Sequence, residues 1–537
     1  MKSAYAWTRA CVAAYEIPRL LSVLLIVVSG AGALPLAVAH SAAAQSGLET
    51  IVETTAGSVS GVNGPVRIYR GIPYAAPPVG DLRWAPPQPV EPWDGLLVAD
   101  EFGPACIQPN AAPSEMSEDC LTLNVWTSAP SADAAQPVLV WIHGGAFRTG
   151  SGGDSWYDGT ALAAEGVVIV TINYRLGNFG FFAHPELSAE NPEGFSGNQA
   201  VLDWVAALEW VQANIAGFGG DPDNVTVWGE SAGATAVGLL AISPKAEGLF
   251  ARGVANSPYG SLRPTTHLTE ARYGREASEN VGAGLGDLAA LRALSAEEVN
   301  ELRRSDGRQI IDGVVIPEDP AAMLLEERMH DIDLMVGTNA DEGATFAPRV
   351  ADAAEAEAAF IDELGDAGAE LMSLYGVTDE TAQDATRAMS GDVLFRMNAR
   401  ELARAAAAGG GGAYLYSFER VSGVGERRGG GTFHAADIPY WFRNLPNAAY
   451  VADVQPGDFT DIDAEISQAM SGHLLSFARN GDPNGEGLPK WRPFRLGDER
   501  HIEYRADGIE AGVNLRWLEL DAVRAINLEW LETSGSD

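Results

Sequence analysis

The sequence predicts an α/β fold in which helices flank a mostly parallel central sheet. Two continuous apolar runs, 137–142 and 167–172, are typical of strands buried on both faces, as the strands of parallel sheets are. Residues 198–215, which follow these runs, carry apolar side chains at helical spacing and precede a β-rich run at 225–228. Because buried strands alternate with helical segments along the chain, we expect the strands to lie parallel in one sheet.

Other segments extend this pattern on either side. Residues 50–72 alternate between apolar and polar side chains in the manner of antiparallel strands, and short apolar runs at 253–256 and 334–337 are further strand candidates. Residues 265–330 and 350–410 are rich in Ala, Glu and Leu at helical spacing. We expect these two segments to form helical insertions over the carboxyl edge of the sheet, where a substrate would enter.

The first 44 residues have the features of a secretory signal. Basic residues precede an apolar run at 20–28, and small residues follow, with Ala44 as the expected cleavage site. An uncleaved membrane anchor is the alternative, because the apolar run with its small-residue tail is nearly long enough to span a bilayer. With residues 1–44 removed, we expect 45–537 to form a single domain, since no linker divides them. The mature chain would then be secreted or periplasmic.

The chain is strongly acidic. Its net charge is −38, from 73 acidic and 35 basic residues, and loss of residues 1–44, which hold three basic residues and one acidic residue, makes it −40. A protein of this charge should repel nucleic acid and anionic membrane surfaces. We therefore expect no nucleic-acid partner and no stable membrane association after signal cleavage. The sequence carries no signal for an oligomeric state.

Two cysteines, Cys106 and Cys120, remain after cleavage, because Cys11 lies in the predicted signal. An even pair of cysteines in an exported chain favours one disulfide. Two free thiols are the alternative, which an oxidising compartment disfavours.

Ser231 lies in a Gly-x-Ser-x-Gly segment, 229–233, between the β-rich run at 225–228 and a helix-compatible run of small residues. In that context the motif indicates a nucleophile elbow, a sharp turn between a buried strand and a helix. Glycines on both sides let neighbouring segments pass close to a strained serine backbone. The helix N-terminus also favours a developing negative charge. The motif alone occurs by chance, so partners elsewhere in the chain decide its weight.

A serine hydroxyl becomes a good nucleophile only when a base takes its proton and a third group holds that base. We expect His434 as the base, because it lies in a loop-like segment after a glycine-rich stretch. Glu342 is the candidate acid: it follows a short strand and lies between Ser231 and His434, in the order of an α/β-hydrolase. Asp341 is an immediate rival that the pattern alone does not exclude.

A second glycine-rich segment, His143-Gly144-Gly145, follows the buried strand at 137–142. Its backbone N–H groups could point at an oxyanion, because glycine lets the main chain approach a substrate. A glycine-rich turn of no chemical importance is the alternative. Together with the elbow, the pattern favours an oxyanion loop.

Several motifs resemble those of the type-B carboxylesterase/lipase family, which includes the cholinesterases. They are the elbow and the segments 71–75, 118–125, 173–177, 218–222 and 481–484, which stand in the family's order over almost all of the mature chain. The resemblance implies an α/β-hydrolase fold and a Ser–Glu–His triad. By motif position the triad falls on Ser231, Glu342 and His434, so the resemblance prefers Glu342 over Asp341.

The resemblance also implies supporting roles. The oxyanion donors would be the backbone N–H groups of Gly145, Ala146 and Ala232. Ser257 matches a second serine that supports the histidine side of the site, and Glu230, next to the nucleophile, is a further supporting residue. The pair Cys106 and Cys120 matches the family's first disulfide.

Three positions bear on how far the resemblance extends. Ala146 stands where many members have a third glycine, which leaves the N–H group in place. The loop between Cys106 and Cys120 contains no tryptophan, so cholinesterase activity is not expected despite Glu230. Arg148 follows the oxyanion loop, where it would favour an anionic substrate; a surface or structural arginine is the alternative.

We therefore expect a serine hydrolase that cleaves small-molecule carboxylic esters through an acyl-enzyme, with no metal and no organic cofactor. A catalytically silent adhesion or binding protein on the same fold is the alternative from another class. Among enzymes, a lipase acting on longer acyl chains is the second choice.

Overall fold

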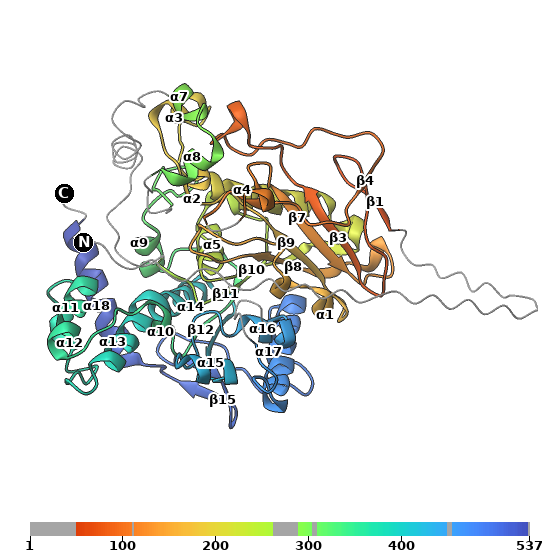
Figure 1. Cartoon of the computed structure of the whole chain (residues 1–537). Helices are drawn as coiled ribbons and strands as arrows, with labels where there is room; N and C mark the ends of the chain where they lie inside the picture. Colours follow the sequence, from red (N-terminus) through yellow and green to blue (C-terminus); the bar gives the residue numbers. More distant parts are fainter. Residues whose placement is uncertain (1–49, 110–111, 261–287, 303–308, 448–453, 535–537) are drawn as a thin grey trace, which may run out of the picture. The chain divides into compact units, whose positions relative to one another are not determined.

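Within the residues that the structure describes, a ten-stranded, mostly parallel sheet forms the centre of the fold (Figure 1). The structure is a computed structural model and describes residues 50–109, 112–260, 288–302, 309–447 and 454–534. The sheet order is β15-β14-β13-β12-β11-β10-β8-β9-β7-β3. Pairing is parallel from β9 through β8 and β10 to β14, and antiparallel at both ends. The predicted α/β class is confirmed.

The bounds of the ten strands are β3 Arg67–Pro73, β7 Thr122–Thr127, β8 Gln136–Ile142, β9 Val168–Ile172, β10 Gly220–Glu230, β11 Arg252–Asn256, β12 Asp333–Asn339, β13 Ala413–Phe418, β14 Arg500–Arg505 and β15 Gly508–Val513. Six of them overlap predicted runs, whereas β7, β13, β14 and β15 were not predicted from the sequence. The predicted antiparallel strands near the start of the described chain are also present, as β1 (Ile51–Glu53) paired with β2 (Ser58–Ser60); β4 (Leu96–Val98) completes that small sheet.

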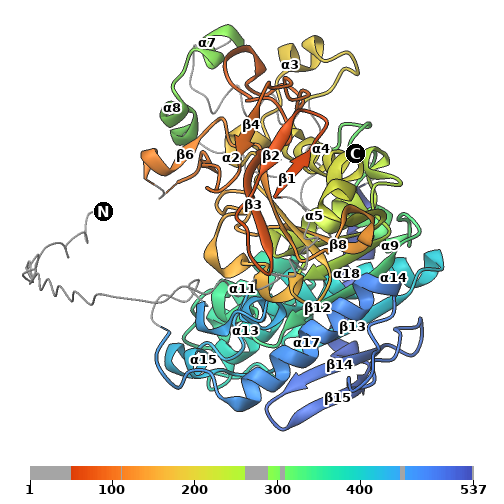
Figure 2. The ribbon, with the colours of Figure 1, turned by 90° about the vertical axis from the view of Figure 1, so that its right-hand side faces the viewer.

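Helices cover both faces of the sheet, because side chains of a strand alternate between its faces. Along β8, Val138, Val140 and Ile142 belong to one apolar core, and Leu139 and Trp141 belong to the other. The first core also contains side chains of α4 (Gln199–Asn214), α5 (Ala232–Leu240), α9 (Pro320–Leu325) and α14 (Met397–Gly409). The second contains side chains of α1 (Thr160–Ala163), α16 (Ile438–Trp441) and α17 (Asp461–Asn480). Figure 1 labels these three helices, and Figure 2 shows α17 beside β13 and β14.

The two predicted insertions are helical where the structure describes them. The first contains α7 (Leu288–Arg292), α8 (Ala296–Glu301) and α9, while 265–287 and 303–308 lie outside the described residues. The second contains α11 (Ala353–Leu364), α12 (Gly368–Leu371), α13 (Ala382–Gly391) and α14. Their predicted position over the carboxyl edge is wrong for α9 and α14, because both pack into the core on one face of the sheet.

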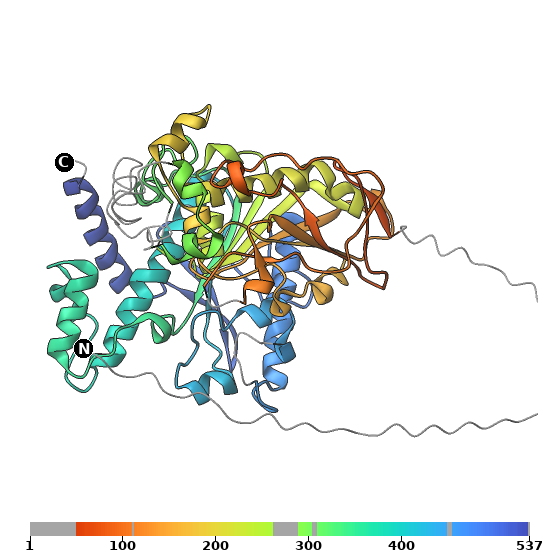
Figure 3. The same cartoon turned by 45° about the horizontal axis from the view of Figure 1, so that its top comes forward.

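The remaining helices of the second insertion gather in one place. α11, α12 and α13 share a small apolar core with α18 (Trp517–Ser534), and these helices lie side by side in Figures 1 and 3. This cluster is built from Phe360, Leu371, Met389, Val393, Met397, Leu520 and Val523. The C-terminal helix is therefore held against the second insertion.

Other short elements complete the fold. They are β5 (Ala105–Cys106), β6 (Met116–Ser117), α2 (Gly177–Gly180), α3 (Pro185–Glu190), α10 (Gly343–Phe346) and α15 (Gly423–Arg428), together with 3-10 turns. A disulfide joins Cys106 to Cys120 across a Cα–Cα distance of 5.1 Å, as predicted. The described residues, 50–534 with their gaps, belong to one compact unit. The predicted signal, 1–44, lies outside the described residues, and among the described helices none is long and apolar enough to span a bilayer.

Candidate active site

Ser231 lies on the turn between β10 and α5. Its backbone is in the left-handed region, with φ of 56°, which is strained for any residue other than glycine. The two glycines of the motif are required by space. A Cβ atom on Gly233 would lie 1.9 Å from the carbonyl oxygen of Ile142, and one on Gly229 would lie 2.4 Å from the backbone of Gly233. The close approach of β8 to this turn therefore explains the Gly-x-Ser-x-Gly pattern.

A continuous chain of hydrogen bonds joins Ser231, His434 and Glu342. Nε2 of His434 lies 2.8 Å from Oγ of Ser231, and Nδ1 of His434 lies 2.6 Å from Oε2 of Glu342. All three side chains are buried. They come from three segments: Ser231 from the β10–α5 turn, Glu342 from the residues after β12, and His434 from the loop before α16.

Asp341, the rival acid, faces another way. Its Oδ2 accepts a hydrogen bond of 2.9 Å from the backbone N–H of Thr432. Of these two neighbouring carboxylates, Glu342 is the one that contacts His434. The geometry therefore supports the same acid that the family resemblance preferred.

Glu342 is held by donors on its second oxygen. Oε1 accepts hydrogen bonds from Oγ of Ser257 at 2.5 Å and from the backbone N–H of Asn339 at 2.8 Å. Burial alone would raise the pKa of Glu342, but the charge of His434 and these hydrogen bonds outweigh burial and lower it. Ser257 was expected on the histidine side of the site, and its hydroxyl reaches the histidine through Glu342 rather than directly.

Glu230 adds a second carboxylate beside the imidazole. Its Oε1 lies 3.2 Å from Nε2 of His434, and its side chain is buried. Burial raises the pKa of Glu230 to about 8. Burial would lower the pKa of His434, but the charges of Glu230 and Glu342 outweigh it and raise that pKa to about 9. Two carboxylates therefore raise the pKa of the imidazole, and burial favours the neutral form of one of them, Glu230.

A third buried carboxylate, Asp437, was not identified from the sequence. It accepts hydrogen bonds from the phenol of Tyr416 at 2.9 Å, the indole of Trp441 at 3.0 Å and the amide of Asn339 at 3.2 Å. The same Asn339 amide lies 3.3 Å from Oε1 of Glu342, so it links the two acids. The position of Asp437 three residues after His434 is the one sequence feature that could have indicated it.

Two aromatic side chains pack on the imidazole and were also missed. The ring centroid of Phe346 lies 5.0 Å from that of His434, and the centroid of Phe395 lies 4.7 Å from it. Phe346 ends α10, and Phe395 lies in the π-helical segment Asp392–Arg396 between α13 and α14. The second insertion thus reaches the site through this short segment.

The predicted oxyanion loop passes close to Ser231. A Cβ atom on Gly144 would lie 3.1 Å from Cβ of Ser231. Gly145 and Ala146 both have positive φ, at 102° and 55°. Among the described residues, neither N–H group donates to a protein acceptor. Ala232 is the first residue of α5, where the backbone N–H has no partner within the helix.

His143 anchors this loop from below. Its ring stacks on Tyr174, with centroids 4.4 Å apart, and its Nδ1 donates to the carbonyl oxygen of Gly144 at 2.8 Å. Burial lowers the pKa of His143 to about 4. A histidine that is neutral and enclosed in this way holds the loop and is not available as a base.

The site opens into a cleft of about 770 Å³. Ser231, His434 and the oxyanion loop line the cleft together with aromatic side chains. The aromatic members are Phe102, Trp156, Tyr157 and Phe346. Among the described residues, no group of three or more His, Cys, Asp or Glu side chains is arranged to hold a metal ion.

A nucleophile on a strand–helix turn of a mostly parallel sheet, with acid and histidine following in that order, defines an α/β-hydrolase. Residues 48–513 match the carboxylesterase family, and the chain belongs to that family. The class of enzyme predicted from the sequence, a carboxylic ester hydrolase, is thereby confirmed.

Individual relatives agree with this family. The chain is 38% identical to a fumonisin B1 esterase of Sphingopyxis macrogoltabida, over 86% of each chain. It is 35% identical to a para-nitrobenzyl esterase of Bacillus subtilis, over 82% of this chain and 91% of the relative. Among solved structures, a PNB esterase superposes with a TM-score of 0.76 at 31% identity, over 88% of this chain and 99% of the other. A carboxylesterase of Geobacillus stearothermophilus gives a TM-score of 0.75 at 34% identity, over 88% and 99%.

Proposed function

We propose that this protein hydrolyses small-molecule carboxylic esters through an acyl-enzyme on Ser231, with His434 and Glu342 as the other members of the triad. The observation that carries the proposal is the pair of hydrogen bonds on one imidazole, 2.8 Å to Ser231 and 2.6 Å to Glu342. This is the geometry that a serine nucleophile, its base and the group that orients the base require.

Each residue has a defined task in the proposed cycle. His434 takes the proton of Ser231 as Oγ attacks the ester carbonyl, and it then gives that proton to the departing alcohol. Glu342 holds the imidazole in the required orientation and stabilises its charged form. A water molecule, activated by His434, hydrolyses the acyl-enzyme and restores Ser231.

The backbone N–H groups of Gly145, Ala146 and Ala232 would bind the oxyanion. They surround Ser231 from two sides, since the loop passes over its Cβ atom and Ala232 begins the helix behind it. Each such donor can contribute about 3 kcal/mol to lowering the barrier. The dipole of α5 adds to the same effect.

Two features support action outside the cytoplasm. The predicted signal at 1–44 would export the chain, and the disulfide between Cys106 and Cys120 is of the kind that persists in oxidising compartments. The mature protein would be secreted or periplasmic. Its charge disfavours nucleic acid and anionic membrane surfaces as partners.

The proposal is tested with a fluorophosphonate probe and a short-chain 4-nitrophenyl ester. We expect the probe to label the purified protein once, and Ser231→Ala to remove the label and lower kcat by a factor of about 10³ or more. Ser128→Ala is the matched control, because this hydroxyl donates to the carbonyl oxygen of Ala163 and lies outside the cleft lining. A Ser231→Ala protein that keeps the label and the rate would reject the assignment.

The same assay separates the alternatives. A silent binding protein would react with neither the probe nor the ester. A lipase would turn over long-chain emulsified esters faster than short-chain soluble ones.

A further inference from the structure

Arg148 lines the same cleft as Ser231 and His434. It follows Ala146 of the oxyanion loop by two residues, and its backbone N–H donates to the carbonyl oxygen of Gly145 at 3.0 Å. The turn that forms the oxyanion loop therefore also fixes where the Arg148 side chain begins. Its side chain is half-buried. The sequence left two roles open for this residue: a surface or structural arginine, or contact with an anionic substrate.

The contacts of Arg148 do not fit a structural role. Within the described part of the chain, its guanidinium makes no ion pair and no hydrogen bond. Structural arginines of this protein behave differently. Arg420 pairs with Asp463 at 2.7 Å, and Arg443 pairs with Glu165 at 2.6 Å.

The carboxylates that line the cleft do not compete for Arg148. Glu230 is turned toward His434, at 3.2 Å. Asp154 accepts a hydrogen bond from the side chain of Trp156. Glu115 is exposed. Among the described lining residues, Arg148 is the one arginine or lysine, so besides the imidazole of His434 it is the cation that a bound anion would meet.

We propose that Arg148 binds a carboxylate of the substrate, so that the preferred esters carry a free carboxylate besides the ester group. This inference rests on the proposed function, since it assigns the substrate class of that same site. The planar guanidinium matches a carboxylate through two parallel N–H···O bonds, which gives orientation as well as affinity. The acidic surface opposes an anionic ligand only over a Debye length of about 8 Å at physiological salt, whereas a contact pair in the cleft is screened less.

Two matched pairs of esters test the proposal. Monoethyl adipate and ethyl hexanoate have the same acyl chain length, and the first carries a carboxylate where the second has a methyl group. The acetyl esters of 6-hydroxyhexanoate and of hexanol differ in the same way on the alcohol half. Hydrolysis is followed by titration of the released acid, and the measured quantity is the ratio of kcat/KM for the charged ester to kcat/KM for its neutral partner.

For Arg148→Gln we expect this ratio to fall by about tenfold to a hundredfold in one pair, because a charge-assisted hydrogen bond is lost. The pair that responds tells which half of the substrate carries the carboxylate. The ratio for Arg148→Lys should lie between those of wild type and Arg148→Gln, since lysine keeps the positive charge but loses the two parallel N–H donors of the guanidinium. Arg492→Gln is the matched control for net charge: Arg492 is exposed and outside the cleft lining, and its ratios should stay at the wild-type value.

A folded Arg148→Gln protein whose ratios stay within about twofold of wild type for both pairs of esters would overturn the inference. A hydrogen bond between a guanidinium and a carboxylate contributes far more than a twofold change. Equal ratios for Arg148→Lys and wild type decide against it in the same way if Arg148→Gln does not fold. Failure of the proposed function looks different. In that case wild-type protein hydrolyses none of the four esters, or Ser231→Ala hydrolyses them at the wild-type rate.

Discussion

Two clusters of buried charge in this protein are built in opposite ways. Around the candidate nucleophile, three buried carboxylates lie near one imidazole. Glu342 and Glu230 contact His434 directly, and Asp437 is linked to Glu342 through the amide of Asn339. The cation of this cluster is a histidine, which loses its charge within the range of pH that a protein tolerates. Negative charge therefore exceeds positive charge, and the pKa values of both His434 and Glu230 are raised.

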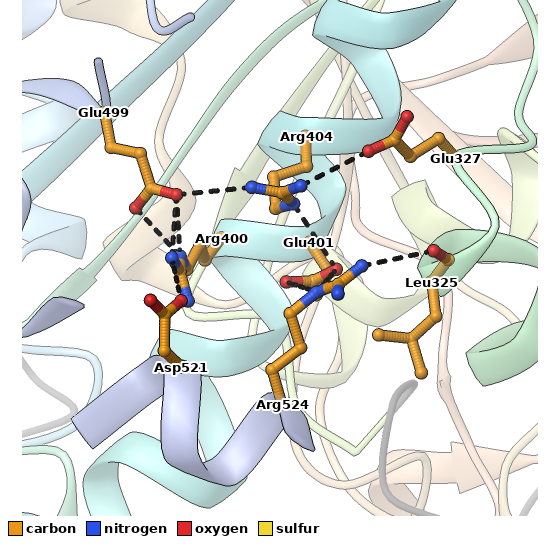
Figure 4. Close-up of polar contacts among 8 residues, drawn as sticks. All are labelled: Leu325, Glu327, Arg400, Glu401, Arg404, Glu499, Asp521 and Arg524. Atoms are coloured by element: carbon orange, nitrogen blue, oxygen red, sulfur yellow. Dashed lines mark hydrogen bonds and ion pairs between the residues drawn. The ribbon is translucent and has the colours of Figure 1, made fainter. Parts of the chain in front are cut away.

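The second cluster joins α14 to α18 and is rich in arginine (Figure 4). Arg400 on α14 contacts Glu499 at 2.8 Å and Asp521 on α18 at 2.6 Å. Arg524 on α18 contacts Glu401 on α14 at 3.1 Å. Arg404 lies 3.4 Å from both Glu327 and Glu499. Each carboxylate here faces at least one guanidinium.

The two clusters differ in whether the charge of their cations changes with pH. A guanidinium keeps its charge at all pH values that a protein tolerates, so the α14–α18 cluster stays paired. Burial raises the pKa of Glu401, and Arg524 and Arg404 oppose that rise. At the site, the charge of the imidazole changes with pH and with each proposed proton transfer. We therefore expect substitutions at the site to change rates and substitutions in the α14–α18 cluster to change stability.

The largest expected effect is that of Glu342→Gln. The amide can hold the wrong tautomer of His434, and we expect kcat to fall by about 10⁴-fold with little change in thermal stability. The matched control is Asp341→Asn, whose carboxylate faces the backbone of Thr432. Its kcat should stay within about threefold of wild type, as for most surface changes. Equal losses in the two variants would show that the acid has been assigned wrongly.

A smaller effect is expected for Glu401→Gln in the α14–α18 cluster. The change leaves Arg524 without its carboxylate partner. This should lower the free energy of unfolding by about 2–3 kcal/mol, because one partner of a buried ion pair is removed. Urea unfolding followed by fluorescence measures the effect. Glu318→Gln, in the exposed pair with Arg328, should leave the unfolding midpoint unchanged. A loss of kcat at 25 °C in folded Glu401→Gln protein would contradict the separation of the two clusters.

The comparison also shows what the sequence could predict. Strands such as 137–142 were predictable because burial on both faces requires a continuous apolar run. The turn at Ser231 was predictable because a strained turn requires glycines on both sides. The choice between Asp341 and Glu342 depended on the direction of each side chain, which the local sequence does not reveal. The family resemblance supplied the choice of Glu342. Phe395 acts through a contact between distant segments, so no local pattern marks it, and Asp437 is marked only by its position three residues after His434. Helical spacing indicated α14 but not the face of the sheet on which it packs.

The last and smallest effect concerns the pH dependence of the site. The charge of Glu230 raises the pKa of His434, which reaches about 9. The reaction requires a neutral imidazole, so activity rises with pH as His434 loses its proton. Glu230→Gln removes the negative charge, lowers the pKa of His434 and should move the acidic limb of the kcat/KM profile to lower pH.

Glu115→Gln is the control. Glu115 is an exposed carboxylate of the same cleft, and its replacement should leave the limb in place, because solvent screens its charge. A limb that stays at its wild-type position in Glu230→Gln would mean that Glu230 is neutral beside the imidazole throughout the working range, and that Glu342 alone sets the basicity of His434.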